Sequence, residues 1–392
     1  MFSSQSAEIN LETHLSSLES VQGDRSTNRF LAGSCSVGEP NFLCVLRFHS
    51  SLNELGIDAH LEHATGPVGV ICCNPNDSKQ VLTVAQESQT ATLWTIPEEV
   101  ISRDDEPEYN PEGGGTVELN QPQDEDHALE QVATLVDFEG EGPIVDMSWR
   151  FTGSDFGEPP SDLAGGSVLS LDRVGRVTLW DIEALQTVKS AAAGKETTTS
   201  KPRILAPRMA WDPHNPETLA VTAGEGVRLI DWRTDATVTS DSISQITRAH
   251  RYGVCDVDYN PNKPHVLATS GQDGLLKFWD LRQNSRPLLL TARGGHSHYA
   301  SRIKYNPFHD QLVLSCGTDG VENLWRASSI SSAPLLDEDG EQNVRVVRQE
   351  HGDAVTALSW GAADAWVYMS AAYDGKVRLN HVPSKEKYKI LL

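Results

Sequence analysis

The amino-acid sequence predicts an all-β protein in which seven four-stranded blades close into a ring, the β-propeller. The first observation is a complete unit at 249–282, where short runs of alternating apolar residues are separated by turn-forming Pro, Asn, Asp and Gly. The second is a constant spacing, because 29 residues separate His250 from Trp279 and also His296 from Trp325. One such unit cannot bury both faces of its own sheet, so the repeats must pack on one another.

The first four blades depart from this unit to different degrees. The first shows two apolar runs around a Gly-Glu-Pro turn and lacks the tryptophan. The second runs 31 residues from His63 to Trp94, which places a small insertion in one turn, and the third ends in a regular Trp180-Asp181 pair. In the fourth, Ile230 takes the Trp position. We expect these blades at 29–49, 63–96, 131–183 and 205–233.

The last three blades share one spacing. In the seventh, Asn380 replaces the tryptophan but still follows His351 by 29 residues. Each of the three also places an Asp-Gly pair five residues before the Trp position, which predicts a tight turn between the second and third strands. We expect these blades at 249–282, 295–326 and 350–382, which completes seven.

The ring is expected to span 28–383, with other segments attached to it. Residues 1–27 are polar and form either a flap or the strand that closes the ring. Residues 98–130 hold twelve acidic side chains and one arginine, too polar a composition to offset the entropy of ordering. We expect a disordered insertion there, which either solvates the ring or docks on a basic partner, and a second acidic insertion at 327–349. A tail, 384–392, follows the last blade.

A His that opens a blade and a Trp-Asp that ends its third strand resemble the WD-repeat family. In that family the His, a second-strand Ser or Thr, the turn Asp and the Trp form a buried hydrogen-bonded chain that holds each blade together. The resemblance implies that role for His250, Ser270, Asp273 and Trp279, and in later blades for His296, Asp319, Trp325, His351 and Asp374.

The later blades depart from this set of residues, and the set also allows a catalytic interpretation. Cys316 and Ala371 stand at the position of Ser270, so we expect the network to weaken in the last two blades. A His-Ser-Asp set also suggests a hydrolase, but a catalytic triad would occur once, whereas this spacing recurs. We therefore expect a structural role for these residues.

Composition excludes several functions. The formal net charge of −23 argues against nucleic acid as a partner, because phosphate binding needs a basic surface. The six cysteines show no metal-ligand spacing and indicate a reduced, intracellular protein with no metal and no cofactor. No apolar run is long enough for direct membrane insertion. Neither a phosphate-cradling glycine loop nor a paired-carboxylate site stands out, so we expect no enzymatic activity.

Several strings of the sequence narrow the family. The blade-seven strings EHGDAVTALSW and AAYDGKVRLNHVP, the ending KYKILL and the string DVDYNPNKPHVLATSGQDGLLKFWDLR resemble the EARP and GARP complex-interacting proteins, WD-repeat proteins of endosomal and Golgi traffic. The resemblance spans the chain and is poorest in 1–60. It implies a non-enzymatic adaptor for the endosome-associated recycling protein and Golgi-associated retrograde protein tethering complexes.

The same resemblance implies a place in the cell. The chain would support endosomal recycling and retrograde transport to the trans-Golgi network. It would be a cytoplasmic protein held at the trans-Golgi network and endosomes through subunits of the tethering complexes, and we expect it to be monomeric by itself. A second interpretation comes from Trp279-Asp280-Leu281-Arg282, which resembles the box by which some WD-repeat proteins dock on cullin ubiquitin ligases as substrate receptors.

Two candidate partner sites follow from the sequence. In WD-repeat rings the residues after the opening His commonly contact partners, and aromatic and Arg side chains concentrate interface energy. The alternative is that the tyrosines are inward strand residues. The competing site is the apolar end of the tail. The candidates are Arg251, Tyr252, Tyr299 and Asp353 on the loops, beside His298, and Ile390, Leu391 and Leu392 on the tail.

Overall fold

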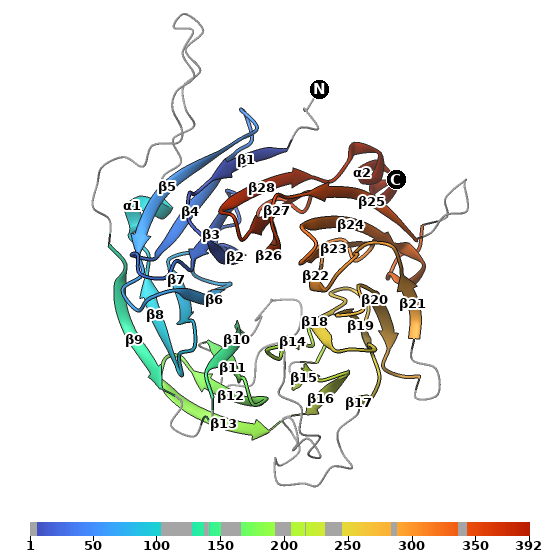
Figure 1. The fold of residues 1–392 in the computed structure, drawn as a ribbon, viewed down its shortest axis with the longest axis horizontal. Coiled ribbons are helices and arrows are strands. Elements are labelled where there is room, and N and C mark those ends of the chain that lie inside the picture. Colours follow the sequence, from blue (N-terminus) through green and yellow to red (C-terminus); the bar gives the residue numbers. More distant parts are fainter. Residues whose placement is uncertain are drawn as a thin grey trace, which may run out of the picture.

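The computed structural model describes residues 6–102, 128–136, 140, 142–149, 166–192, 205–215, 217–231, 245–283, 288–335 and 343–392. Across these ranges the strands form seven four-stranded antiparallel sheets, arranged around a central axis (Figure 1). The seven-bladed β-propeller is therefore confirmed. Apolar residues that alternate along short strands give each sheet two faces, and both faces pack against neighbouring blades.

The strands fall into four concentric sets. The innermost are β2 (Leu15–Ser20), β6 (Val68–Cys73), β10 (Ile144–Trp149), β14 (Met209–Trp211), β18 (Val254–Tyr259), β22 (Ala300–Tyr305) and β26 (Val355–Trp360). The second are β3 (Arg29–Ser34), β7 (Gln80–Ala85), β11 (Ser167–Asp172), β15 (Thr218–Ala223), β19 (Val266–Gly271), β23 (Leu312–Gly317) and β27 (Val367–Ala372). The third are β4 (Phe42–His49), β8 (Thr90–Thr95), β12 (Arg176–Asp181), β16 (Gly226–Asp231), β20 (Leu276–Asp280), β24 (Val321–Ala327) and β28 (Lys376–His381). The outermost are β5 (Glu54–Glu62), β9 (Glu130–Val136), β13 (Gln186–Ala192), β17 (Gln245–Ile246), β21 (Leu288–Ala292), β25 (Asn343–Glu350) and β1 (Ala7–Asn10).

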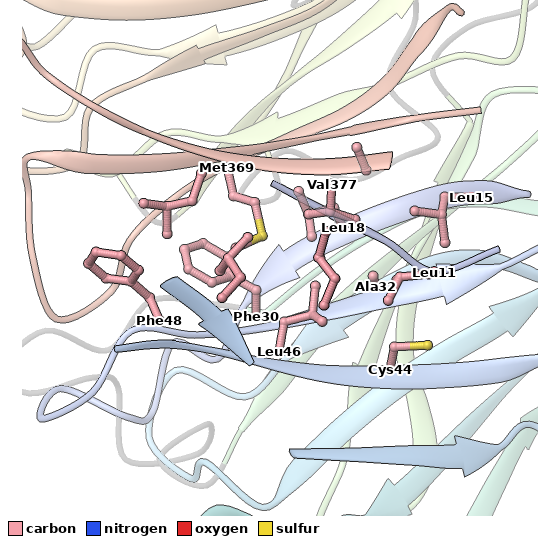
Figure 2. Packing of buried hydrophobic residues seen from close by; sticks show 14 of the residues in the cluster. Leu11, Leu15, Leu18, Phe30, Ala32, Cys44, Leu46, Phe48, Met369 and Val377 are labelled. Atoms are coloured by element: carbon pink, nitrogen blue, oxygen red, sulfur yellow. The ribbon is translucent and has the colours of Figure 1, made fainter. Parts of the chain in front are cut away.

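The hydrophobic core lies between the blades. The buried apolar side chains that the structure describes form seven clusters, and each cluster draws on two adjacent sheets. Figure 2 shows one of them, where Met369 and Val377 of the seventh blade face Leu18, Phe30 and Leu46 of the first. Burial between sheets ties every blade to two neighbours, so no blade is independent of the ring.

The N-terminal segment closes the ring. Strand β1 pairs with β28 in antiparallel register, from Ala7 opposite Leu379 to Asn10 opposite Lys376. Of the two alternatives for 1–27, the ring-closing strand is therefore correct for the described part. The same segment also contains β2, so the first blade runs from Leu15 to Glu62 and the expected range of 29–49 was too short. A bulge between Leu15 and Ser17 breaks the two-residue alternation and hid this strand.

Both expected insertions are narrower than their composition suggested. Residues Glu98–Ile101 form the helix α1, whose Val100 and Ile101 are buried in the core between blades one and two. In the second insertion, Ser328–Ile330 form a 3-10 turn, η1, and the outer strand β25 starts at Asn343. The valines of that strand favour β structure, although an acidic cluster precedes it in the sequence. The remaining parts of the two insertions, 103–127 and 336–342, lie outside the described residues.

The tail forms a helix, α2 (Ser384–Leu391). Its Glu386 is buried and pairs with Arg326 at the end of β24, with 3.1 Å between Nη1 and Oε2. Ile390 packs against the cluster between blades six and seven. Among the described segments, no helix is both long and apolar enough to cross a membrane.

Candidate functional site

One face of the ring carries the loops that open the blades. Because the strands of each sheet are antiparallel, the loops that enter an inner strand and the turns that follow a second strand lie on the same face. We call this the histidine face and define it by the loops 247–253, 293–299 and 351–354 and the turns 272–275 and 318–320. The opposite side, where α2 follows β28, is called the helix face.

A directional hydrogen-bond chain holds the fifth blade at this face. Trp279 Nε1 donates to Thr269 Oγ1 at 2.9 Å, and that hydroxyl lies 2.8 Å from His250 Nε2. His250 Nδ1 lies 2.7 Å from a carboxylate oxygen of Asp273. With the imidazole proton on Nδ1, every donor in the chain has an acceptor. The tryptophan, threonine and histidine groups are buried, and Asp273 is half-buried at the surface end of the chain. The chain ties the opening loop, two strands and the turn together.

The hydroxyl of this chain belongs to Thr269, so the assignment to Ser270 was wrong. Neighbouring residues of a strand point to opposite faces, and only Thr269 faces His250 and Trp279. Ser270 is buried, and its Oγ has no hydrogen-bond partner among the described residues. The same one-residue shift replaces Cys316 with Ser315 and Ala371 with Ser370.

With that register the network, or part of it, also appears in the second, third and sixth blades. In the sixth blade Ser315 Oγ lies 2.8 Å from His296 Nε2 and accepts from Trp325 Nε1 at 2.9 Å, and His296 Nδ1 lies 3.2 Å from Asp319. The expected decay in this blade is therefore wrong. The second blade repeats the chain through His63, Thr83 and Trp94, and the third keeps the bond from Trp180 to Ser170.

The seventh blade departs from this scheme in a different way from the one expected. His351 Nε2 lies 2.9 Å from Ser370 Oγ, but Asp374 accepts from the Lys376 N–H and does not contact the histidine. A buried carboxylate from the sixth blade, Glu322, approaches instead and accepts from Asn380 Nδ2 at 2.8 Å. Asn380 thus replaces the lost indole with a hydrogen bond to the neighbouring blade.

The turn aspartates also fix the loops of the histidine face. Burial opposes the ionisation of Asp273, but the hydrogen bonds from His250 and from the Arg251 and Leu275 N–H groups outweigh it and lower the pKa of this carboxyl. For Asp319, burial is likewise outweighed by the Ser297 N–H and by His296, and its pKa is lowered. Burial is the main cause of the lowered pKa of His296. A charged acceptor therefore pins the main chain beside each opening histidine.

The fifth-blade candidates lie at the surface. Tyr252 is 60% exposed, and the Arg251 guanidinium carbon lies 5.1 Å from the centre of its ring. The inward-strand alternative therefore does not hold for Tyr252. Gly253, with φ of 151°, lets the chain leave the loop for β18 directly after this tyrosine.

The other loop candidates differ in exposure. Tyr299 is half-buried and stacks with the exposed His298 at a centroid distance of 4.2 Å, so it supports that ring from below. Asp353 is exposed, and its carboxylate accepts from the Ala354 N–H at 2.6 Å. The histidine face thus offers Arg251, Tyr252 and His298 directly and Tyr299 through His298.

The tail candidates lie on the helix face, away from these loops. Ile390 is half-buried against the ring, whereas Leu391 is 63% exposed and Leu392 is fully exposed. Trp366 lies next to them, stacked on His309 and with the Lys387 ammonium 5.7 Å from its ring centre. The structure therefore separates the two sets of candidate residues onto opposite faces and does not join them in one site.

The Trp279-Asp280-Leu281-Arg282 box ends the third strand of the fifth blade on the helix face. Arg282 is 60% exposed on its side chain, and its Nη2 lies 2.8 Å from Asp280. The hydrogen bonds from Arg282 lower the pKa of Asp280 to about 2. Within the box, Asp280 and Arg282 therefore pair with each other, and the Arg282 guanidinium lies at the surface.

Sequence reasoning missed the charged residues of the inner strands. Asp146 accepts from the Met209 N–H at 2.9 Å, Asp256 from Ile303 N–H at 3.1 Å and Asp258 from Tyr305 N–H at 2.7 Å. Each bond joins one inner strand to the next blade. The sequence did offer a signal for these contacts, because each of these aspartates stands within a segment expected to form an inner strand.

The described residues offer no group of three or more His, Cys, Asp or Glu side chains that could hold a metal ion. All six cysteines are buried and free of disulfides. Burial raises the pKa of Cys44, Cys255 and Cys316 to about 12. These thiols are therefore poor nucleophiles and act as small core residues.

Comparison with known proteins places this geometry in a family. A family model described as EIPR1 beta-propeller matches residues 175–325, and one described as WD domain, G-beta repeat matches 342–379. The chain is 30% identical to the rat "EARP and GARP complex-interacting protein 1", with 97% of each chain covered. It is 31% identical to the Danio rerio "EARP-interacting protein homolog", again over 97% of each. The Caenorhabditis elegans "EARP-interacting protein 1" is 35% identical over 46% of this chain and 52% of its own.

Proposed function

Because the chain belongs to the EARP and GARP complex-interacting protein family, we propose that it is a non-enzymatic adaptor for the EARP and GARP complexes. The names of relatives that align over 97% of both chains carry this proposal. In this role it binds subunits of the two tethering complexes and supports endosomal recycling and retrograde transport to the trans-Golgi network. It is held at those membranes through its partners, from the cytoplasm.

We propose the histidine face as the side that binds the tethers. Its loops are held by buried hydrogen-bond chains, so little conformational entropy is lost when a partner binds. Its exposed Tyr252 and Arg251 are side chains that concentrate binding energy. On the helix face, Leu391 and Leu392 offer apolar area only at the last turn of a helix.

The test is binding of purified EARP complex to the immobilised full chain, measured as a Kd. The variant Tyr252→Ala/His298→Ala removes two exposed rings and leaves the buried network intact, and we expect it to weaken binding at least about tenfold. The matched variant Leu391→Ser/Leu392→Ser changes two exposed residues of the helix face and should bind like the wild type. Equal melting temperatures of all three proteins establish that folding is intact.

Three results would change the proposal. Loss of binding only in the leucine variant moves the site to the helix face. Failure of the wild type to bind the complex refutes the adaptor role. Capture from cells of a cullin-ligase adaptor in place of tether subunits, abolished by Arg282→Ala, favours the ligase alternative, because Arg282 is the exposed residue of its box.

A further inference from the structure

Five arginines gather at one edge of the histidine face, on blades five and six. All five are exposed, in a protein with a formal net charge of −23. Together with the exposed Tyr252 they form what we call the arginine edge. Its members are Arg248, Arg251, Tyr252, Arg293, Arg345 and Arg348.

The parts of the arginine edge adjoin one another. Loop 247–253 carries its first three members, and the Arg251 N–H donates to Asp273 in the neighbouring turn at 3.3 Å. In that turn, a Cβ on Gly274 would come within 2.9 Å of the His296 carbonyl oxygen, so the turn lies against loop 293–299. Arg345 Nη1 then donates to the carbonyl oxygen of Gly294 in this loop at 2.6 Å. One continuous surface runs from Arg251 to β25.

The exposed charges of this region are mainly those of its arginines. Asp273 and Asp319 are held by the opening histidines. Among the described residues, the exposed carboxylates nearby are Glu225, Glu350 and Asp353, and Glu350 pairs with Arg348. Counted with the two turn aspartates, five carboxylates lie among five arginines, so the edge is distinguished by its exposed guanidiniums and not by a net positive charge.

We propose that the arginine edge binds an acidic segment of a tether subunit, an inference that rests on the proposed function. A guanidinium binds a carboxylate through two parallel N–H bonds, and Tyr252 adds apolar contact beside Arg251. In a protein with a formal net charge of −23, this edge gathers five exposed guanidiniums, so charge complementarity favours an acidic segment there. The same overall charge opposes an anionic bilayer, which would approach a much wider area of the ring.

The test compares two charge-matched double variants for binding to purified EARP complex. Arg251→Glu/Arg293→Glu reverses two residues of the edge, and we expect a Kd at least about tenfold higher. Arg25→Glu/Arg173→Glu reverses two exposed arginines outside it and should leave the Kd unchanged. Raising the salt concentration should weaken the wild type and the control more than the edge variant, since the edge variant has lost the screened attraction.

A conservative pair identifies the partner chemistry directly. Arg251→Lys/Arg293→Lys keeps the charge and introduces amines, which carbodiimide couples to carboxylates in direct contact. We expect cross-links from residues 251 and 293 to an Asp- or Glu-rich segment of the complex, identified by mass spectrometry. Arg25→Lys/Arg173→Lys should give none.

The outcomes separate the two proposals. If the wild type binds the complex and the edge reversal binds equally well, the arginine edge is overturned while the adaptor role stands. If the wild type does not bind the complex, both the adaptor role and the arginine-edge inference are refuted. Binding of the wild type to vesicles containing phosphatidylserine, lost in the edge reversal, would make the edge a lipid site and overturn the acidic-segment inference.

Discussion

A single hydroxyl decides how each regular blade is held. The Thr269 hydroxyl accepts a hydrogen bond from the Trp279 N–H and donates one to His250 Nε2, so it satisfies two buried groups at once. Leaving a buried donor or acceptor unpaired costs about 1 to 3 kcal/mol. Ser270, one residue later, is equally buried but takes part in no such bond. The stability of the blade thus depends on which of two adjacent hydroxyls is changed.

Replacing Thr269 with Val should therefore lower the free energy of unfolding by about 2 to 4 kcal/mol, since it removes the partner of two buried groups while keeping the volume. Ser270→Ala, the matched control, should change it by less than about 1 kcal/mol. Urea denaturation of both variants is the measurement. Equal losses would mean that the hydrogen-bond register is wrong.

Near the axis of the ring, the carboxyl group of Asp258 lies where burial disfavours its charged form. Burial raises the pKa of Asp258 from its ordinary value of 3.8 to about 6, although Lys304 and the Tyr305 N–H act in the opposite direction. A folded-state pKa above the unfolded value means that the native state binds the proton more tightly. The ring is then destabilised by this group as the pH rises from about 4 to 6.

The substitution Asp258→Asn should stabilise the ring at pH 7.5 by about 1 to 3 kcal/mol, because the amide oxygen still accepts from Tyr305 and carries no charge. At pH 4 the wild-type carboxyl is largely protonated in the folded protein, so the difference should nearly vanish. Unfolding free energies of both proteins at the two pH values test this. A variant less stable than the wild type at pH 7.5 would show that the carboxylate is needed as a charge.

Among the elements, β1 is the strand that closes the ring. Its four residues complete the outer edge of the seventh blade and join the N-terminal segment to the end of the ring. Ala7 and Ile9 face the core between blades seven and one, while Glu8 points outward to Arg378. The ring therefore stays closed only while β1, near the N-terminus, remains paired with β28, near the C-terminus.

Ile9→Ala should cost about 2 to 4 kcal/mol, because Ile9 is buried and its loss leaves a cavity at the closure. Glu8→Ala removes only a half-exposed ion pair with Arg378 and should cost under about 1 kcal/mol. Differential scanning calorimetry compares the two. A larger loss for Glu8→Ala would mean that the closure depends on charge and not on packing.

At the scale of the whole molecule, the blades are unequally stabilised. In the fourth, Ile230 stands opposite Leu219 as Trp279 stands opposite Leu267, which confirms that Ile230 occupies the Trp position. The hydroxyl position of that blade holds Val221. Its inner strand β14 has three residues, against six for β18. The fourth blade has a short ladder between its inner and second strands and lacks the complete network.

Hydrogen exchange should therefore be fastest in the fourth blade. We expect amides of β15 and β16 to exchange at least about tenfold faster than those of β19 and β20, since local opening there breaks fewer bonds. Mass spectrometry of peptides from the two blades measures this. Equal protection in both would indicate that the ring opens only as a whole.

The sequence predicted the ring, its seven blades, the opening histidines and the positions of the third-strand tryptophans. These follow from local chemistry, because tight turns need Asp-Gly or Asn-Pro and each strand needs apolar residues on one face. The family was also within reach, since whole strings such as AAYDGKVRLNHVP resemble it. The acidic composition of 98–130 and 327–349 wrongly predicted that these whole ranges are insertions, whereas α1 and β25 lie within them.

Other features depended on contacts between distant residues. The choice of Thr269 over Ser270 needed the contacts with His250 and Trp279, and the role of Glu322 beside Asn380 needed the neighbouring blade. The closure by β1 and the arginine edge join residues that are far apart in the chain. Sequence alone determined which units repeat, because repetition is local. Tertiary structure decided how they close and what surface they present, because both depend on which blade lies beside which.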